Sequence, residues 1–291
     1  MNPNPLVQYL NKPAAEFTKE DLIRYCEDND ISMVNFRYTG WDGRLKTLNF
    51  IINSREHLDS ILTTGERVDG SSLFSFIEAG SSDLYVVPRY KTAFVNPFTD
   101  IPTLDILCSY FDKDGNPLES APEYILKKAH QSFREVTGME FETMGELEYY
   151  VIFEKEPLYK AVDQRGYHES VPFTKWEALR TEAMMAVAQS GGQIKYGHSE
   201  VGNFSVGDTE YEQNEIEFLP VNVEDAADQI MVAKWILRTL ASKYGVTVTF
   251  APKITVGKAG SGLHIHTRLM KDGKNMMVDD QGLTDTAKKA I

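Results

Sequence analysis

Cysteine and basic side chains are both scarce in this sequence. Its only two cysteines, Cys26 and Cys108, lie far apart along the 291 residues. This spacing excludes a disulfide framework and a cysteine metal motif, and it fits a reducing, cytoplasmic location. Thirty Lys and Arg residues stand against 43 Asp and Glu residues, which gives a net charge of -13. Such a field repels nucleic acid and anionic membranes, so we expect neither as a partner and expect part of the acidity to bind cations.

Long apolar runs are also absent. No segment approaches the ~20 apolar residues that a membrane-spanning helix needs. The N-terminus has no apolar stretch flanked by positive charge, as an export signal would have. We therefore expect a soluble, unexported protein. Its hydrophobic fraction of 42% is enough to form a substantial core, either in one large domain or in two ordinary ones.

The first third of the sequence predicts a small antiparallel sheet. Thr18 followed by Asp21 is typical of a helix cap, so a short helix is expected directly after Thr18. Two β-rich runs, 31–39 and 45–52, flank an Asp-Gly pair that is typical of a tight hairpin turn. Residues 64–82 are rich in Gly, Ser and acids and are interpreted as loops before a strand.

The rest of the sequence alternates long helices with short strands. Helices are expected from Pro122 to Gly138, at 174–190 with Thr174 and Glu177 as a capping box, and at 223–244. The strand-like segments between them are rich in β-branched and aromatic residues and lie at 141–153, 191–201, 214–220, 245–256 and 262–270. We predict the α+β class, with a mixed or antiparallel sheet backed by helices on one side.

Proline-rich segments set the expected boundaries. Residues 1–16 contain three prolines and no periodic pattern, so they are interpreted as an N-terminal extension. A second proline-rich stretch begins near residue 97 and suggests that the first domain ends close by. We expect a first domain over 17–103 and a second over 104–291.

Acidic and imidazole side chains recur at a spacing of two within the predicted strands. Glu146 and Glu148 should point to one face, because successive side chains of a strand alternate. His264 and His266 repeat this geometry after a Gly-rich turn, and the same rule applies to Glu215 and Glu217, with Glu200 as a further candidate. Carboxylates with few imidazoles suit Mg²⁺ or Mn²⁺ better than zinc. The alternatives are a solvent-facing stripe and histidines bonded to backbone carbonyls.

The Gly-rich turn itself has two interpretations. Gly260 and Gly262 would let the backbone approach a phosphate or carboxylate closely. They are equally compatible with an ordinary turn at the entry to a strand.

Seven segments, taken in order, resemble the signature segments of the glutamine synthetase family. They are VDGSS, SSDLYVVP, PEYILKKA, GELEYYVIF, GHSEV, EQNEIEF and APKITVGKAGSGLHIHT. The resemblance, to type I enzymes in particular, implies an N-terminal β-grasp domain and a catalytic α+β domain. It also implies a homo-oligomeric ring with active sites between subunits.

The resemblance also implies roles for single residues. Glu148, Glu200 and Glu215 match ligands of the metal on the glutamate side, and Glu146 and His264 match ligands of the metal that bridges ATP phosphates. His266 matches the catalytic histidine beside the nucleotide phosphates, and Gly260 matches the loop that contacts the amino-acid substrate. The implied reaction uses ATP and Mg²⁺ or Mn²⁺ to convert glutamate to a γ-glutamyl phosphate, which ammonia then attacks.

Three departures from the family pattern leave alternatives open. Gly40 stands where the resemblance implies an ammonium-binding Asp, and Asp42 lies two residues on. Ala259 and Arg268 replace the usual residues around the Gly-rich turn and the second histidine. The sequence ends at Ile291, inside an expected helix, so we expect an incomplete catalytic domain from a truncated or divergent member. The alternatives are a γ-glutamyl ligase for a larger amine and a non-catalytic structural or regulatory member.

Overall fold

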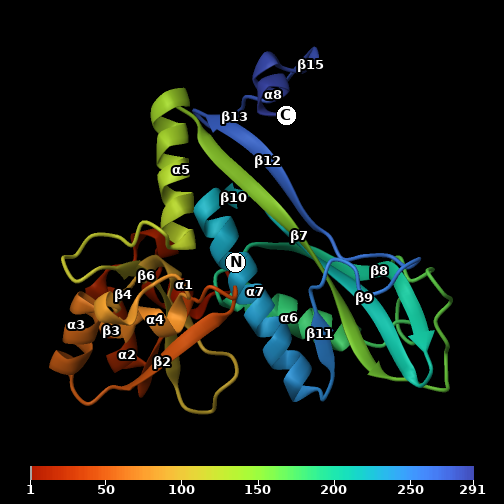
Figure 1. Ribbon diagram of the computed structural model, residues 1–291, viewed down its shortest axis with the longest axis horizontal. Coiled ribbons are helices and arrows are strands. Elements are labelled where there is room, and N and C mark those ends of the chain that lie inside the picture. The colour runs from red at the N-terminus through yellow and green to blue at the C-terminus, as the bar shows by residue number, and fades with distance from the viewer. Residues whose placement is uncertain (1) are drawn as a thin grey trace. The chain divides into compact units, whose positions relative to one another are not determined.

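A computed structural model describes residues 2–291 of the protein, apart from the side chain of Ser81 (Figure 1). The chain divides into two compact units. The first comprises Met1–Lys128 with Ala188–Gly191, and the second comprises Ala129–Val187 with Gly192–Ile291. No helix within the described residues is long and apolar enough to cross a membrane.

The first unit is built on a six-stranded sheet with the order β2-β1-β6-β4-β3, in which β5 pairs with β6. Strands β1 and β6 are parallel, whereas the other pairs are antiparallel. The strands are β1 (Met33–Thr39), β2 (Leu45–Ile51), β3 (Glu66–Asp69), β4 (Asp83–Pro88), β5 (Phe94–Val95) and β6 (Thr103–Phe111). The helices are α1 (Pro5–Leu10), α2 (Lys19–Asp28), α3 (Arg55–Thr64) and α4 (Gly70–Leu73), with 3-10 turns η1 (Ala14–Glu16), η2 (Ala79–Ser81) and η3 (Tyr90–Thr92).

The predicted cap and hairpin of this unit are confirmed. Thr18 and Asp21 form a capping box at the start of α2. The β1–β2 hairpin has the expected antiparallel register. Its turn places Gly43 at φ +68°, a left-handed conformation that glycine adopts without steric cost.

Two segments of this unit hold more regular structure than the sequence indicated. Residues 64–82 contain β3 and α4, so the prediction of loops alone is wrong there. Both elements are only four residues long, and pairing with β4 stabilises β3, which a local pattern does not reveal. Near the N-terminus, Asn4 caps α1 and Pro5 begins it. Leu6 is fully buried in the core of the first unit.

Strand β6 begins where the sequence places the end of the first domain. The sequence places this boundary at residue 103, which is the first residue of β6. Hydrogen bonds join β6 to β1 and β4 within the first sheet. We therefore propose that the first domain extends past Phe111.

The second unit contains a curved sheet with the order β13-β12-β7-β9-β8, and β10 and β11 also pair with β7. All of these pairs are antiparallel. The strands are β7 (Glu140–Glu154), β8 (Ile194–Val206), β9 (Thr209–Phe218), β10 (Val221–Asn222), β11 (Thr247–Thr249), β12 (Leu263–Lys271) and β13 (Lys274–Asn275), with a separate hairpin of β14 (Val278–Asp279) and β15 (Gly282–Leu283). The helices are α5 (Pro122–Thr137), which begins in the first unit, α6 (Glu177–Gln189), α7 (Val223–Lys243) and α8 (Asp285–Ala290).

Helices α6 and α7 cover one face of this sheet (Figure 1). A Cβ added to Gly145 of β7 would lie 2.8 Å from Ile230 of α7, and one added to Gly197 of β8 would lie 2.7 Å from Met184 of α6. Leu147 and Ile216 point to this same face and are almost fully buried. The prediction of a sheet backed by helices on one side is confirmed, and the alternate residues of β7 and β9 form the opposite face.

Two local predictions in this unit need correction. Helix α6 begins at Glu177, and Thr174 does not form a capping box with it. Instead, the Thr174 hydroxyl donates to Glu212 Oε1 at 2.7 Å. The strand expected over 245–256 is limited to the three residues of β11. The residues that follow form the loop 250–262 before β12.

Candidate metal and nucleotide site

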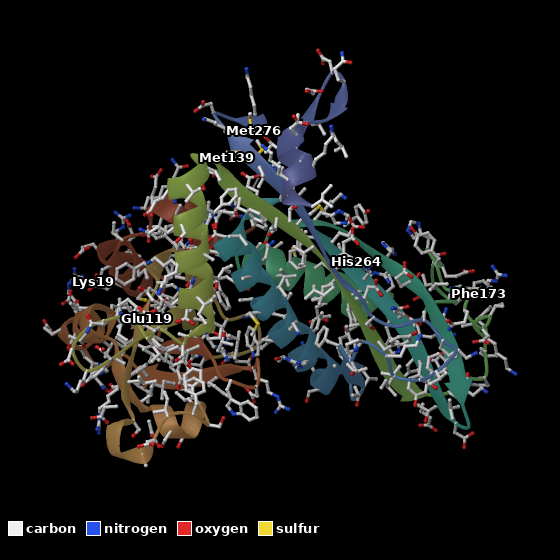
Figure 2. All side chains as sticks on the ribbon, turned by 45° about the horizontal axis from the view of Figure 1, so that its top comes forward. Lys19, Glu119, Met139, Phe173, His264 and Met276 are labelled. Carbon is white, nitrogen blue, oxygen red and sulfur yellow. The ribbon has the colours of Figure 1, made fainter. Side chains whose placement is uncertain are left out.

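Strand register brings four of the predicted site residues together. Glu146 lies opposite His264 of β12 on one side and opposite Glu217 of β9 on the other. Glu148 lies opposite Glu215 of β9. Because alternate residues share a face, these side chains all lie on the face away from α6 and α7. Figure 2 labels His264 on this curved sheet.

Glu146 is held between the two predicted histidines. His264 Nδ1 lies 2.9 Å from one of its carboxylate oxygens, and His266 Nε2 lies 2.7 Å from the other. Both imidazoles are largely exposed, whereas the carboxylate is mostly covered. The two rings are therefore oriented by one acid and remain accessible to a ligand.

Glu148 lies deeper in the same cluster. Its carboxylate accepts a hydrogen bond from Gln213 Nε2 at 2.6 Å, and it lies 3.8 Å from His264 Nδ1. Burial raises the pKa of Glu148, and the charges of Glu200 and Glu146 act in the same direction. The backbone of Gly262 opposes this shift by hydrogen bonding to the carboxylate.

Glu215 is the most perturbed acid of the cluster. Burial, followed by repulsion from Glu148, Glu146 and Glu200, raises its pKa to about 8. Its exposed fraction is only 5%. A cation bound here would relieve this repulsion, so the electrostatics of the cluster fit a metal ligand.

The donor atoms also fit a divalent cation. Glu146, Glu215 and His264 each offer one ligand atom, and these atoms lie within 4.8 Å of one another. Two oxygens and one nitrogen suit Mg²⁺ or Mn²⁺ and are less typical of zinc. The geometry therefore brings together Glu146, Glu148, Glu215 and His264, four of the five residues predicted to bind metal.

Glu200 occupies a different local setting. It follows His198 and Ser199 on β8, and its Oε2 accepts a hydrogen bond from the backbone N–H of Val201 at 2.6 Å. Its charge nevertheless contributes to the raised pKa of both Glu148 and Glu215. The fifth predicted ligand thus acts electrostatically on the cluster.

The Gly-rich turn adjoins this cluster at the entry to β12. A Cβ at Gly262 would lie 2.8 Å from Glu148 Oε1 and 2.9 Å from His264 Nε2. A Cβ at Gly260 would lie 2.3 Å from the carbonyl oxygen of Pro252, and the Gly260 carbonyl accepts a bond from Gln213 at 2.7 Å. Gly260 requires glycine because its Cβ would meet backbone, whereas a side chain at Gly262 would push aside the ends of the Glu148 and His264 side chains.

Sequence reasoning missed three residues beside the cluster. Gln213 is fully buried and joins Glu148 to the Gly-rich turn. Lys195 Nζ lies 2.8 Å from Glu217 Oε2. His198 Nε2 lies 3.3 Å from Glu215 Oε2. The signal for Gln213 was its spacing of two from Glu215, which places both side chains on one face.

The residues that depart from the family pattern have local contacts of their own. Arg268 of β12 donates to Glu142 at 2.6 Å. In the first unit, the Asp42 carboxylate accepts a hydrogen bond from Lys46 Nζ at 2.9 Å. Gly40 lacks the positive φ found at Gly43, but a Cβ there would lie 2.5 Å from Lys46 Cε, so another residue requires the Lys46 side chain to move. The effect of Gly40 on the choice of amine stays a prediction.

Comparison with known proteins places these features in a family. Residues 30–113 match the model of the glutamine synthetase β-grasp domain, and residues 119–291 match that of the glutamine synthetase catalytic domain. The chain is 29% identical over 282 residues to glutamine synthetase of Clostridium saccharobutylicum, covering 95% of this chain and 61% of that protein. It is 28% identical over 283 residues to the Staphylococcus epidermidis enzyme, covering 94% and 61%. The chain therefore spans about 61% of the length of these curated relatives.

Solved structures share the fold. The cryo-EM structure of Plasmodium falciparum glutamine synthetase has a TM-score of 0.82 at 20% identity and covers 95% of this chain and 59% of its own. A ligand-free structure of GmaS has a TM-score of 0.76 at 15% identity and covers 91% and 61%. A β-grasp domain followed by a glutamine synthetase-type catalytic domain is thus confirmed, and the chain belongs to the glutamine synthetase family.

Proposed function

We propose that this protein is an ATP-dependent carboxylate–amine ligase of the glutamine synthetase type. Glutamate is the proposed acid and ammonia the proposed amine, with Mg²⁺ or Mn²⁺ as cofactor. The observation that carries the proposal is the convergence of Glu146, Glu148, Glu215 and His264 on the sheet face away from the helices. By analogy with the family, we also propose a homo-oligomeric ring.

The acidic cluster is the proposed cation site. Glu148 and Glu215, with Glu200, would hold a cation on the glutamate side, and Glu146 with His264 would hold one on the nucleotide side. When bound, divalent cations neutralise the charges of the two anionic substrates and let them approach. Gln213 orients the Glu148 carboxylate through a 2.6 Å hydrogen bond.

His266 is the proposed phosphate-binding residue. Glu146 fixes its ring by a 2.7 Å contact to Nε2, while the side chain stays 59% exposed. The ring is thus oriented and reachable by the phosphates of ATP. Hydrogen bonding or positive charge at this position would stabilise the negative charge that develops during phosphoryl transfer.

The proposed reaction has two steps. A carboxylate oxygen of glutamate attacks the γ-phosphorus of ATP, and ADP leaves, giving γ-glutamyl phosphate. The amine nitrogen then attacks the acyl carbon, phosphate leaves, and the nitrogen releases a proton. The Gly-rich turn at Gly260 is proposed to contact the amino-acid substrate, because its backbone lies at the edge of the cation cluster.

A phosphate-release assay tests this proposal. The full-length gene product would be incubated with glutamate, MgATP and a panel of amines that includes ammonium and methylamine. Release should require both glutamate and an amine, and His266→Ala should lower it about a hundredfold or more. Glu142→Gln is the control, because Glu142 lies on the neighbouring strand β7 and pairs with Arg268.

Each outcome of this assay favours a different reading. Ammonium-dependent release supports the proposal, whereas release with a larger amine alone favours the γ-glutamyl ligase alternative. An absence of release with every amine, while Mn²⁺ still binds, would contradict a catalytic role and favour the non-catalytic alternative.

A further inference from the structure

Residues 162–170, here called the strap, lie between β7 and α6 and follow β8 at the end of the second sheet. Three backbone N–H groups of the strap, spaced by two, donate to three carbonyl oxygens of β8, also spaced by two and in reverse order. The pairs are Gln164 with Asn203, Gly166 with Val201 and His168 with Ser199, at 2.8, 3.3 and 3.0 Å. The strap is thus fastened to the part of β8 that contains Glu200.

Side chains and close backbone contact reinforce this attachment. Ser199 Oγ is almost fully buried and lies 2.9 Å from the Gly166 carbonyl oxygen and 2.8 Å from that of Glu169. A Cβ added to Gly166 would lie 2.5 Å from the carbonyl oxygen of Glu200, so the two backbones touch. The strap therefore offers a fixed support to whatever binds its outer end.

The outer end of the strap holds the loop 250–262. Gln164 Oε1 accepts a hydrogen bond from the backbone N–H of Ala259 at 2.7 Å, and Gln164 Nε2 donates to the Asn203 carbonyl at 3.2 Å. Beside it, Lys258 Nζ lies 2.8 and 2.5 Å from the two carboxylate oxygens of Asp163. Asp163 is 59% exposed, so this ion pair alone contributes little, and Gln164 is the stronger link.

Ala259 is consequently held from both sides. Its N–H bonds to Gln164, and its carbonyl accepts from the Tyr150 hydroxyl at 2.9 Å. The loop around it contains Gly257, with φ +79°, and Gly260. A glycine-rich chain loses much conformational freedom when it is fixed, so bonds from outside the loop decide where it lies.

We propose that Gln164 is a positioning residue, which holds the loop 250–262 over the carboxylate cluster and thereby sets the affinity for the amino-acid substrate. This inference rests on the proposed function, in which the Gly-rich turn of this loop contacts that substrate. Preorganising a binding loop lowers the entropy that the ligand must offset. Gln164 therefore acts through the loop and touches no reacting atom.

Hydrogen exchange tests whether Gln164 holds the loop. Gln164→Met keeps the length of the side chain but cannot accept the Ala259 N–H. Exchange in the peptide that contains Ala259, measured by mass spectrometry in EDTA, should accelerate about tenfold. Arg165→Met is the matched control, because Arg165 is the next residue of the strap, is exposed, and its side chain forms no hydrogen bond or ion pair among residues 2–291.

Steady-state kinetics of the full-length gene product test the effect on substrate. Gln164→Met should raise the KM for glutamate about tenfold, while kcat and the KM for ATP stay within about twofold. Lys258→Met, at a half-exposed position that the fold tolerates more readily, should move exchange and the glutamate KM in the same direction by about two- to threefold. Melting curves in EDTA would check that each variant folds.

The outcomes separate this inference from the proposed function. Unchanged exchange in Gln164→Met would show that Gln164 does not hold the loop. Faster exchange with an unchanged glutamate KM, or equal changes in kcat and in both KM values, would show that its role is only structural. If the unaltered protein does not use glutamate, the proposed function fails, and the exchange rate still decides whether Gln164 positions the loop.

Discussion

Among the clustered acids on the sheet face away from α6 and α7, here called the acidic face, Glu215 is the one whose ionised form is most strongly disfavoured. Its pKa of about 8 lies above its ordinary value of 4.5, chiefly because of burial and also because of neighbouring carboxylates. Between these two values the folded, metal-free protein holds a proton that the unfolded chain releases. The stability that this group contributes is therefore present below about pH 4.5 and is lost as the pH rises through about 8.

Replacing Glu215 by Gln should remove the loss of stability that occurs as the pH rises. In EDTA, the melting temperature of Glu215→Gln relative to the unaltered protein should rise between about pH 5 and about pH 8.5, because glutamine cannot ionise. A constant difference for Glu215→Gln across this range would contradict the raised pKa.

The absence of a side chain at Gly262 leaves room for two of the proposed metal ligands. A methyl group there would lie within 3 Å of both Glu148 Oε1 and His264 Nε2. Gly262→Ala should therefore displace two proposed ligands and weaken Mn²⁺ binding about tenfold or more, with little loss of stability in EDTA. Isothermal titration calorimetry would measure this change.

Ser261→Ala is the control for Gly262→Ala. The Ser261 hydroxyl is buried next to Gly262 and has no hydrogen-bond partner among residues 2–291, so its removal should leave Mn²⁺ binding unchanged. Equal effects of the two substitutions would show that the turn matters only for folding.

At the scale of elements, one buried side chain links three segments. Gln213 of β9 accepts from the N–H of Gly202 at 3.0 Å and donates to Glu148 and to the Gly260 carbonyl. The Tyr150 hydroxyl donates to the Ala259 carbonyl at 2.9 Å in the same loop. The loop 250–262 is thus held over the acidic face by side chains of β7 and β9.

Gln213→Met should loosen this loop. It leaves the Gly202 N–H and the Gly260 carbonyl without their partner, which costs roughly 1 to 3 kcal/mol of unfolding free energy per buried group. Urea denaturation would measure the loss, and hydrogen exchange of residues 257–262 should accelerate. Gln131→Met, at an exposed position on α5, is the control, and equal protection of the loop in both variants would contradict the link.

Features local to one strand could be predicted from the sequence, whereas the pairing between strands could not. A spacing of two correctly predicted that Glu146 and Glu148 share a face, because alternation is local to one strand. Which residue of β12 or β9 lies opposite Glu146 depends on register, which no single segment reveals. The predicted capping box at Thr174 failed for a similar reason. The backbone N–H groups of Lys175 and Trp176 donate to Glu212 of β9, an acid distant in sequence.

For the whole molecule, the net charge of -13 and the local acidic face have different consequences. The overall charge sets the sign of the long-range electrostatic field. At short range, the carboxylates of Glu146, Glu148, Glu200 and Glu215 repel one another. The central claim is that divalent cations stabilise this face. At a concentration of about 100 times its dissociation constant, one cation should add about 2.7 kcal/mol to the unfolding free energy.

Thermal unfolding of the protein and of Glu148→Gln, each in EDTA and in saturating MgCl₂, tests this claim most directly. The unaltered protein should melt roughly 5 to 10 °C higher with Mg²⁺. Glu148→Gln keeps the shape of the side chain and should melt at least as high as the unaltered protein in EDTA, since one repelling charge is gone. Mg²⁺ should then raise its melting temperature clearly less than that of the unaltered protein, because the cation held by Glu148 and Glu215 is lost. An equal rise with Mg²⁺ in both proteins would contradict the proposed metal site.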